Sequence, residues 1–327
     1  MNNFLYSGKH WLYLLIPVSI IYSIIILFRQ FLYKKNILKS TKFSVPVIVV
    51  GNITTGGTGK TPLVIWLSEF LQKLGYKPGI VSRGYKGKAE KYPIAVTLKS
   101  EAKIVGDEPL LIAKRTGRPV VVDPNRVNAI NYLLENFSCD IVISDDGLQH
   151  YAMKRDIEIA VIDGQRGLGN GWCLPVGPLR ESSKRLGQVD FVINNGGKNN
   201  QYSMDLQLEQ VINLKNPNKK ILISDLVGKP IHAVAAIGNP QRFFQALRSH
   251  NLNIIEHVFP DHYYFSAKDL QFADEALVIM TEKDAVKCRQ IEHLKDDPRL
   301  WVVPVTAQLD PALAEQIVEK CRGRSPA

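Results

Sequence analysis

A glycine-rich run that ends in Lys-Thr is the part of this sequence with the clearest chemistry. The run follows an apolar segment over residues 45–50. An apolar strand, a glycine-rich turn and a helix that opens on Lys-Thr can hold nucleotide phosphates, because backbone N–H groups and the helix dipole point at the anion. Lys60 would reach the β- and γ-phosphates, and the Thr61 hydroxyl would ligate Mg²⁺. The residues expected to bind the nucleotide are Thr54, Thr55, Gly56, Gly57, Thr58, Gly59, Lys60 and Thr61.

One position departs from the general phosphate-binding pattern. That pattern has a glycine five residues before Gly59, where this sequence has Thr54. The alternative interpretation is an ordinary glycine-rich turn between a strand and a helix, with Lys-Thr there by chance. The apolar strand in front of the turn favours phosphate binding over that alternative.

A second apolar run, residues 140–144, leads into the carboxylates of Asp145 and Asp146. P-loop proteins hold a second acidic element for Mg²⁺ at such a place, and Mg²⁺ takes hard oxygen ligands, including one or two carboxylates. An acidic turn after a strand is the alternative. Since the phosphate-binding run is also present, we predict that Thr61, Asp145 and Asp146 ligate Mg²⁺.

Three further residues have both a chemical and a structural interpretation. Asp107 could be a general base toward a hydroxyl, but it also fits the start of a helix, and spacing alone favours a cap. His262 could hydrogen-bond a catalytic carboxylate across a closing cleft, or it could pack between tyrosines. Glu181, which follows Arg180 in a proline-bounded loop, could support the metal, and a surface ion pair is an equal alternative.

The N-terminal region contains an apolar segment without charge over residues 11–28, followed by Arg29, Lys34, Lys35, Lys39 and Lys42. This is the lower length limit for a bilayer span, and the basic flank would place the rest of the chain in the cytoplasm. A cleaved signal peptide is disfavoured because the charge follows the apolar run. A buried core helix is an alternative, and the sequence does not decide between a spanning helix and one that lies in the interface.

The composition is basic, with a formal net charge of +10 over 327 residues. This charge suits an anionic membrane surface or a phosphorylated substrate. The basic residues are scattered and match no nucleic-acid-binding motif, so we expect no nucleic-acid partner. The 4 cysteines are far apart, which argues against a disulfide framework and against a zinc site.

The elements that must position these residues alternate in an α/β pattern. We expect strands over residues 45–50, 78–82, 119–123, 140–144, 157–163 and 190–194, with helices over 62–74 and 126–136. A second series would have strands over 231–237, 254–258, 276–280 and 301–305, with helices over 240–250, 266–275 and 282–288. Residues 281–284 are typical of a helix start, with Thr281 as N-cap. Short uninterrupted apolar strands predict a mostly parallel sheet with ligands at the carboxyl ends of its strands.

This pattern predicts a P-loop NTPase-like sheet flanked by helices, a smaller second α/β domain and an N-terminal membrane-associated helix. We expect the membrane-associated helix within residues 1–40 and the nucleotide-binding, catalytic domain over 41–215. A linker over 216–229 and the smaller domain over 230–327 would follow. Two domains with a cleft between them suit phosphoryl transfer, which must exclude water.

Several motifs together resemble one family, tetraacyldisaccharide 4′-kinase, the lipid A 4′-kinase of bacteria. They recur in order over nearly the whole chain, which makes the resemblance more specific than any single motif. They are Gly-Asn at 51–52, Gly-Gly-Thr-Gly-Lys-Thr-Pro at 56–62, Ser-Arg-Gly-Tyr at 82–85, Gly-Asp-Glu-Pro at 106–109, Asp-Asp-Gly-Leu-Gln-His at 145–150, Pro-Leu-Arg-Glu at 178–181, Asp-His-Tyr at 261–263 and Thr-Glu-Lys-Asp at 281–284.

The resemblance implies an ATP- and Mg²⁺-dependent kinase at the cytoplasmic face of the bacterial inner membrane. It would phosphorylate the 4′-hydroxyl of a glycolipid, tetraacyldisaccharide 1-phosphate, to give lipid IVA. The residue matching Asp107 would be the base, assisted by the one matching His262, which reverses the preference for a cap. Residues matching Asp145, Asp146 and Glu181 would support Mg²⁺. The alternatives are a membrane-associated P-loop NTPase that acts as a switch, and a structural protein with a vestigial P-loop.

Overall fold

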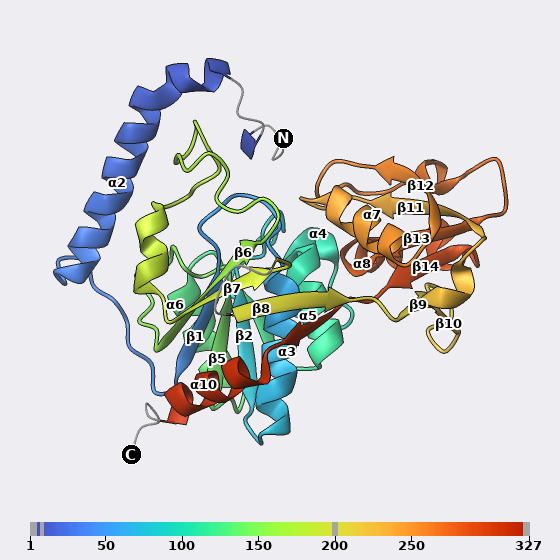
Figure 1. The fold of residues 1–327 in the computed structure, drawn as a ribbon. Helices are drawn as coiled ribbons and strands as arrows, with labels where there is room; N and C mark the ends of the chain where they lie inside the picture. Colours follow the sequence, from blue (N-terminus) through green and yellow to red (C-terminus); the bar gives the residue numbers. More distant parts are fainter. Residues whose placement is uncertain (1–4, 7–9, 198–201, 323–327) are drawn as a thin grey trace.

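Two β-sheets, each covered by helices, make up the computed structural model, which describes residues 5–6, 10–197 and 202–322 (Figure 1). The larger sheet has 9 strands and the smaller has 6. We call the larger sheet with its helices the large unit, and the smaller sheet with its helices the small unit. The carboxyl end of β1 and the start of α8, which carry residues of the site, lie where the two units meet.

The large sheet is parallel except for its outermost strands, β15 and β3, which pair antiparallel. Its central strands β1, β5 and β2 are buried along their whole length, as expected for parallel strands covered on both faces. The predicted mostly parallel sheet is therefore confirmed. In spatial order the strands are β15 (Thr306–Leu309), β8 (Tyr202–Gln207), β7 (Phe191–Asn195), β6 (Ile157–Asp163), β1 (Val47–Gly51), β5 (Ile141–Asp145), β2 (Pro78–Ser82), β4 (Val120–Val122) and β3 (Ile94–Ala95).

The helices of the large unit cover both faces of this sheet, because alternate residues of β1 belong to different cores. Ile48 and Val50 pack with α3, α5 and α10, whereas Val47 and Val49 pack with α6. The helices of this unit are α3 (Lys60–Lys73), α4 (Ala102–Val105), α5 (Asp107–Thr116), α6 (Arg126–Asn136) and α10 (Pro311–Arg322), with a 3₁₀ helix, η2 (Ser183–Gln188).

The small unit has a parallel group of strands extended by an antiparallel pair, β9 and β10. In spatial order its strands are β10 (Lys220–Leu222), β9 (Gln210–Asn213), β14 (Leu300–Val303), β13 (Leu277–Thr281), β11 (Pro230–Ala235) and β12 (Asn253–Val258). Its helices are α7 (Pro240–Ser249), α8 (Glu282–Cys288) and α9 (Glu292–Lys295), with η3 (Ile223–Leu226) and η4 (Ala267–Leu270). Thr281 caps α8, because its side chain accepts from the N–H of Asp284, as the sequence predicted.

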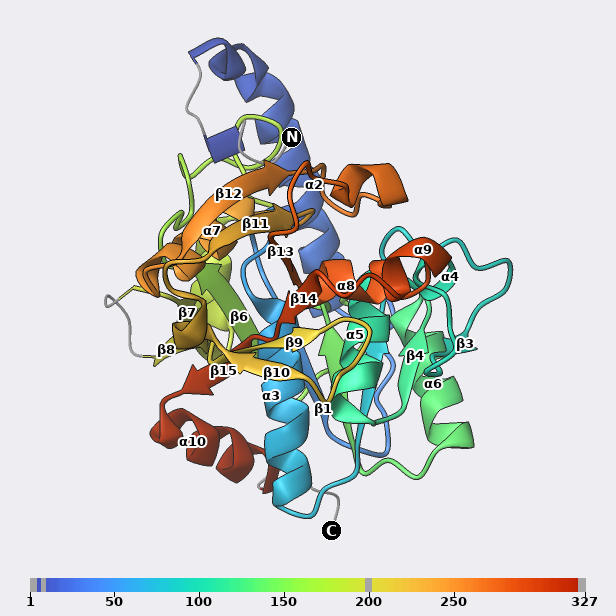
Figure 2. The ribbon, with the colours of Figure 1, turned by 90° about the vertical axis from the view of Figure 1, so that its right-hand side faces the viewer.

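The chain divides between the sheets differently from the expected boundaries. Residues 210–222, expected in the first domain and the linker, pair with the small sheet, because Val211 is buried in its core. Residues 306–322, expected in the second domain, return to the large unit, where β15 pairs with β8 and α10 buries Leu313 and Ile317. Figure 2 shows β15 and α10 on the side of α3, away from β11–β14. A helix is expected over residues 266–275, but only the short 3₁₀ helix η4 forms there. After η4 the chain turns, and the Asp274 carboxylate accepts a hydrogen bond from the backbone N–H of Ala276.

The apolar N-terminal segment forms a 3₁₀ turn, η1 (His10–Leu15), and the helix α2 (Ile16–Lys34) along the outer flank of the large unit (Figure 1). By length and composition, residues 10–34 could cross a membrane, and only 11% of the most apolar window is buried. Pro17 lies in the first turn of α2, where it starts the helix instead of kinking it.

Candidate active site

The glycine-rich run forms a loop between the end of β1 and the start of α3. Gly56 and Gly59 have φ angles of 97° and 96°, which other residues adopt only with strain. A Cβ on Gly59 would lie 2.0 Å from Nδ2 of Asn195, whose side chain donates to the Thr58 carbonyl. The helix α3 begins directly after this loop, with Lys60 and Thr61 as its first residues. This is the arrangement in which backbone N–H groups can bind an anion, and the role of residues 54–61 in binding stays a prediction.

Residues 178–180 pair with the start of this loop, which accounts for a threonine at position 54. Thr54 forms an antiparallel bridge with Leu179, the Thr55 N–H donates to the Pro178 carbonyl at 2.8 Å, and the Arg180 N–H donates to the Ile53 carbonyl at 2.7 Å. Thr54 thus pairs as a buried extended residue, and this place does not need a glycine.

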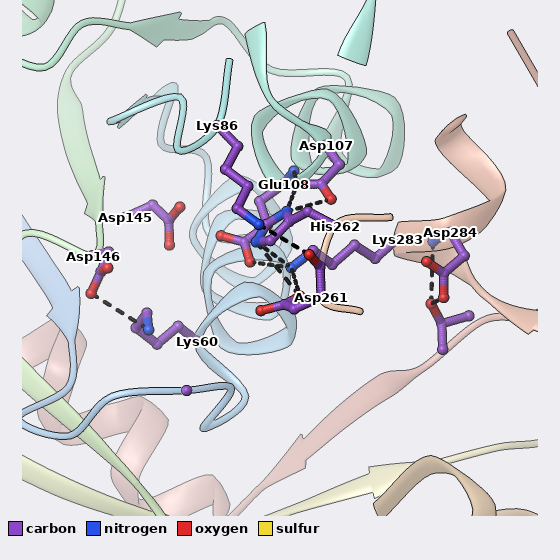
Figure 3. A network of polar contacts seen from close by, with 12 residues as sticks. Lys60, Lys86, Asp107, Glu108, Asp145, Asp146, Asp261, His262, Lys283 and Asp284 are labelled. Carbon is purple, nitrogen blue, oxygen red and sulfur yellow. Dashed lines mark hydrogen bonds and ion pairs between the residues drawn. The ribbon is translucent and has the colours of Figure 1, made fainter. Parts of the chain in front are cut away.

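The two adjacent carboxylates lie at the end of β5, the neighbour of β1, but they differ in surroundings. Asp146 Oδ1 is 3.5 Å from Lys60 Nζ (Figure 3). Its Oδ2 is 3.1 Å from Arg180 Nη1. Asp145 accepts a hydrogen bond from Ser82 Oγ at 3.0 Å, and its other oxygen is buried without a partner. The structure thus brings Lys60 and Asp146 together, as expected of a P-loop site.

The pKa values of these carboxylates move in opposite directions. Burial, with the charges of Glu108 and Asp146, raises the Asp145 pKa to about 7. Burial would also raise the Asp146 pKa, but the charges of Lys60 and Arg180 outweigh it and hold that pKa far below its usual value. A cation at Asp145 would supply the positive charge that this buried oxygen lacks.

Glu181 directly follows residues 178–180 and faces α2. Its carboxylate accepts from the Tyr151 hydroxyl at 2.7 Å and from Gln30 Nε2 at 3.1 Å, and Arg185 Nε is 3.4 Å away. Within residues 5–6, 10–197 and 202–322, no cluster of three or more His, Cys, Asp or Glu side chains is arranged to hold a metal ion. The role of Glu181 in a metal site stays a prediction.

The structure places Asp107 and His262 in contact, a pairing that the resemblance implied and that the residues alone left open. Nδ1 of His262 lies 2.8 and 3.0 Å from the two oxygens of Asp107, and both side chains are buried. Gly106 is the N-cap of α5 and Asp107 is its first residue, whose carboxylate also accepts from the backbone N–H of Glu108 at 2.9 Å. His262 is held at a φ of 64°, with its N–H on the Ala236 carbonyl.

Sequence reasoning missed Lys283, the most connected side chain around this pair. Its ammonium lies 3.0 Å from Glu108, 3.5 Å from Asp261 and 3.3 Å from Nε2 of His262 (Figure 3). A signal was available, because residues 281–284 and 261–263 both follow parallel strands that flank β11, and such strand ends share one edge of a sheet.

A cavity of about 620 Å³ lies between the phosphate-binding loop and the small unit. Its lining includes Lys60 and Thr61 from the loop, Glu108 from α5, and Arg242 and Lys283 from the small unit. This volume is typical of a small-molecule site, and its position joins the loop to the neighbours of the Asp107–His262 pair.

The fold and this site define the class: an α/β protein with a P-loop, whose cavity places a phosphate-binding loop opposite a second α/β unit. Within that class the chain belongs to the tetraacyldisaccharide-1-P 4′-kinase family, whose model matches residues 11–322. The chain is 46% identical to tetraacyldisaccharide 4′-kinase of Methylobacillus flagellatus, over 96% of this chain and 93% of that one. It is 49% identical to the enzyme of that name from Coxiella burnetii, over 90% and 86% of the two chains.

A solved structure supports the same assignment. LpxK from Aquifex aeolicus, crystallised in complex with ATP, superposes with a TM-score of 0.78 at 28% identity, covering 95% of this chain and 99% of that one. The resemblance noted in the sequence is therefore confirmed, and so is the architecture of a large mostly parallel sheet with a smaller α/β unit.

Proposed function

We propose that this chain is an ATP-dependent kinase that transfers the γ-phosphate of ATP to the 4′-hydroxyl of tetraacyldisaccharide 1-phosphate, giving lipid IVA. Family membership over residues 11–322 supports the reaction. The observation that carries the assignment of the site is the cavity shared by Lys60 and by Glu108 and Lys283, which adjoin the Asp107–His262 pair. A phosphate donor and a hydroxyl acceptor can meet there.

The phosphate-binding role belongs to residues 54–61. The N–H groups at the start of α3 would hold the ATP phosphates, and the Lys60 ammonium would neutralise charge that develops on the transferred group. Asn195 and residues 178–180 hold the loop in this conformation, so little of the binding free energy is needed to order it.

Asp107 would receive the proton of the acceptor hydroxyl, with His262 orienting it. Burial opposes ionisation of Asp107, but the charge of Lys283 and the hydrogen bond from His262 prevail and lower its pKa below the usual value. Asp107 is therefore a carboxylate at neutral pH, ready to accept a hydrogen bond. Phosphoryl transfer has a loose transition state, so orientation of the hydroxyl matters more than strong basicity.

Mg²⁺ fits the residues at the end of β5. The unpartnered buried oxygen of Asp145 needs a positive partner. The neighbouring Asp146 contacts Lys60, the residue before Thr61 at the start of α3. Glu181, which directly follows residues 178–180, is a further candidate for supporting Mg²⁺. When bound, Mg²⁺ would supply charge neutralisation to the phosphate oxygens.

The membrane surface is the proposed working place of the enzyme, on its cytoplasmic side. Ser19 donates to the Cys173 carbonyl at 2.7 Å, Tyr22 to the Arg180 carbonyl at 3.0 Å, and Gln30 to Glu181, so α2 lies along the enzyme over that length. Residues 10–18, the helical stretch before Ser19, rise only about 15 Å, too little to cross roughly 30 Å of hydrocarbon. This favours a helix that lies in the interface.

Transfer of label from γ-labelled ATP to tetraacyldisaccharide 1-phosphate in detergent micelles tests the proposal, with and without Mg²⁺. We expect labelled lipid only with Mg²⁺, and about 10²-fold slower transfer by a folded Asp107→Asn variant. ATP hydrolysis without labelled lipid would contradict the kinase assignment and favour a membrane-associated NTPase switch. Wild-type turnover by Asp107→Asn would remove Asp107 from the proton transfer.

A further inference from the structure

Lys283 lies on the small unit but directs its ammonium at groups of both units. Glu108 belongs to α5 of the large unit, whereas Asp261 and His262 follow β12 of the small one. Its side chain is 15% exposed. Burial would lower the pKa of Lys283, but the carboxylates of Glu108, Asp107 and Asp261 raise it well above the usual lysine value. Lys283 is therefore a permanent cation with hydrogen atoms to donate and no lone pair.

The two ring nitrogens of His262 face partners of opposite character. Nδ1 lies 2.8 Å from the Asp107 carboxylate, which only accepts, and Nε2 lies 3.3 Å from the Lys283 ammonium, which only donates. The next group at Nε2, the Asp261 carboxylate, is 3.6 Å away, beyond hydrogen-bond distance. This pattern is satisfied by one form of the ring, in which Nδ1 carries the hydrogen and Nε2 has a free lone pair.

We propose that Lys283 is a positioning residue that donates to Nε2 of His262 and so holds the neutral ring in the tautomer whose Nδ1–H donates to Asp107. Because Lys283 also contacts Glu108 of α5, the interaction that positions Nε2 joins the two units. The proposal rests on the proposed kinase function for its consequence in catalysis, but the tautomer itself does not depend on the substrate.

Loss of Lys283 would expose Nε2 to Asp261 alone. His262 would then face a carboxylate at each ring nitrogen, and no donor would keep a hydrogen off Nε2. The groups that face the pair from the surrounding elements are Asp107 and Glu108 of α5, Lys283 and Lys287 of α8, Asp261 after β12, Lys86, whose ammonium donates to the Asp261 carbonyl, and the rings of Tyr85 and Tyr264.

The first test is ¹⁵N spectroscopy of histidine-labelled protein without substrate, with the His262 signals assigned by their loss in His262→Gln. In the wild type we expect an unprotonated Nε2 and a protonated Nδ1, and in Lys283→Met a hydrogen on Nε2. A wild-type Nε2 that carries hydrogen overturns the proposal, and this result stands even if Lys283→Met fails to fold. Unchanged signals in a folded Lys283→Met also overturn it.

The second test is kinetic. We expect Lys283→Met to lower kcat by about 10²-fold while the KM for ATP stays within about two-fold, since the residue orients the pair. The acid limb of the rate profile should move to higher pH, because the Lys283 charge lowers the Asp107 pKa. A rise in KM with unchanged kcat would instead make Lys283 a nucleotide contact.

Arg115→Met is the matched control. Arg115 of α5 pairs with Glu282 of α8 at 2.7 Å, so this variant removes another ion pair between the same helices, one that does not touch His262. The proposal expects the wild-type tautomer and pH profile in Arg115→Met. The same changes in both variants would reduce Lys283 to a contact between units. If no glycolipid is phosphorylated by the wild type, the proposed function fails, while the spectra still decide the tautomer.

Discussion

Asp145 and Asp146 are neighbours in sequence but behave as different acids. Asp146 faces Lys60 and Arg180, whereas Asp145 is buried with an unpartnered oxygen. Their spacing in the sequence predicted a shared metal role and could not predict this asymmetry, because the positive charges come from residues 60 and 180. Asp146 contacts the P-loop lysine, Lys60, whereas Asp145 has a buried oxygen without a positive partner.

Because of Asp145, the unfolding midpoint of the metal-free protein should depend on pH. The Asp145 pKa rises to about 7 on folding, so its contribution to stability is complete below pH 4 and is lost as the pH rises through 7. Asp145→Asn should therefore raise the unfolding midpoint at pH 8 in EDTA by roughly 2 °C or more, with no gain at pH 4. Thermal unfolding at the two pH values measures this. Equal midpoint differences at both would contradict the raised pKa.

Lys60→Ala should lower kcat by at least about 10²-fold, because it removes a cation held in place for the transition state. Circular dichroism should show an unchanged fold, since Lys60 begins α3 on the surface of the cavity. The measurement is labelled-phosphate transfer at saturating ATP, with Lys73→Ala at the far end of the same helix as control. Near-normal turnover in Lys60→Ala would exclude its contact with phosphate.

At the scale of elements, α2 combines two faces on one helix. Ser19, Tyr22 and Gln30 hydrogen-bond the enzyme, whereas Ile21, Ile25 and other apolar side chains are exposed. The sequence predicted the helix from its apolar composition. It did not predict the docking, because the partners of the polar residues lie in residues 151–181, far along the chain.

Vesicle binding should depend on the exposed face of α2. Ile21 and Ile25 are each 58% exposed, so their transfer into lipid is still available. Ile21→Ser and Ile25→Ser should each weaken partitioning to anionic vesicles about 10-fold, the scale of burying such a side chain. Sedimentation with vesicles measures this, and Ser23→Ala, which loses a bond inside the helix, is the control. Unchanged partitioning of both isoleucine variants would show that this face does not meet lipid.

Some elements were predictable because their evidence is local. The P-loop, the strand that ends at Asp145 and the cap at Thr281 follow from neighbouring residues. The pairing of Asp107 with His262 spans 155 positions and depends on how the units meet, so the residues alone left it open. Lys283 was missed for the same reason, although its motif was recognised.

At the scale of the whole molecule, the small unit is inserted between two adjacent strands of the large sheet, β8 and β15. The expected boundary at residue 230 followed a polar stretch that proved to be the turn between β9 and β10. Polar composition marks a turn as readily as a linker, and only strand pairing separates the two.

Ile317→Ala should destabilise the nucleotide-binding unit. Ile317 is fully buried in the core shared by α3 and β1, so the loss is about 2–5 kcal/mol. Hydrogen exchange should rise in residues 47–73 more than in β11 and β13, and exposed Glu315→Ala should leave both unchanged. Faster exchange confined to the small unit would place α10 with that unit.

The return of β15 also sets an order of events during synthesis. The ribosome releases α2 early, then most of the large sheet, then the entire small unit, and only afterwards residues 306–309. Until then β8 is an open edge with unpaired backbone groups, which invites wrong pairing with other chains. The apolar helix α2 leaves the ribosome long before the nucleotide-binding sheet is closed, so the membrane contact proposed for it would be made by an unfinished enzyme.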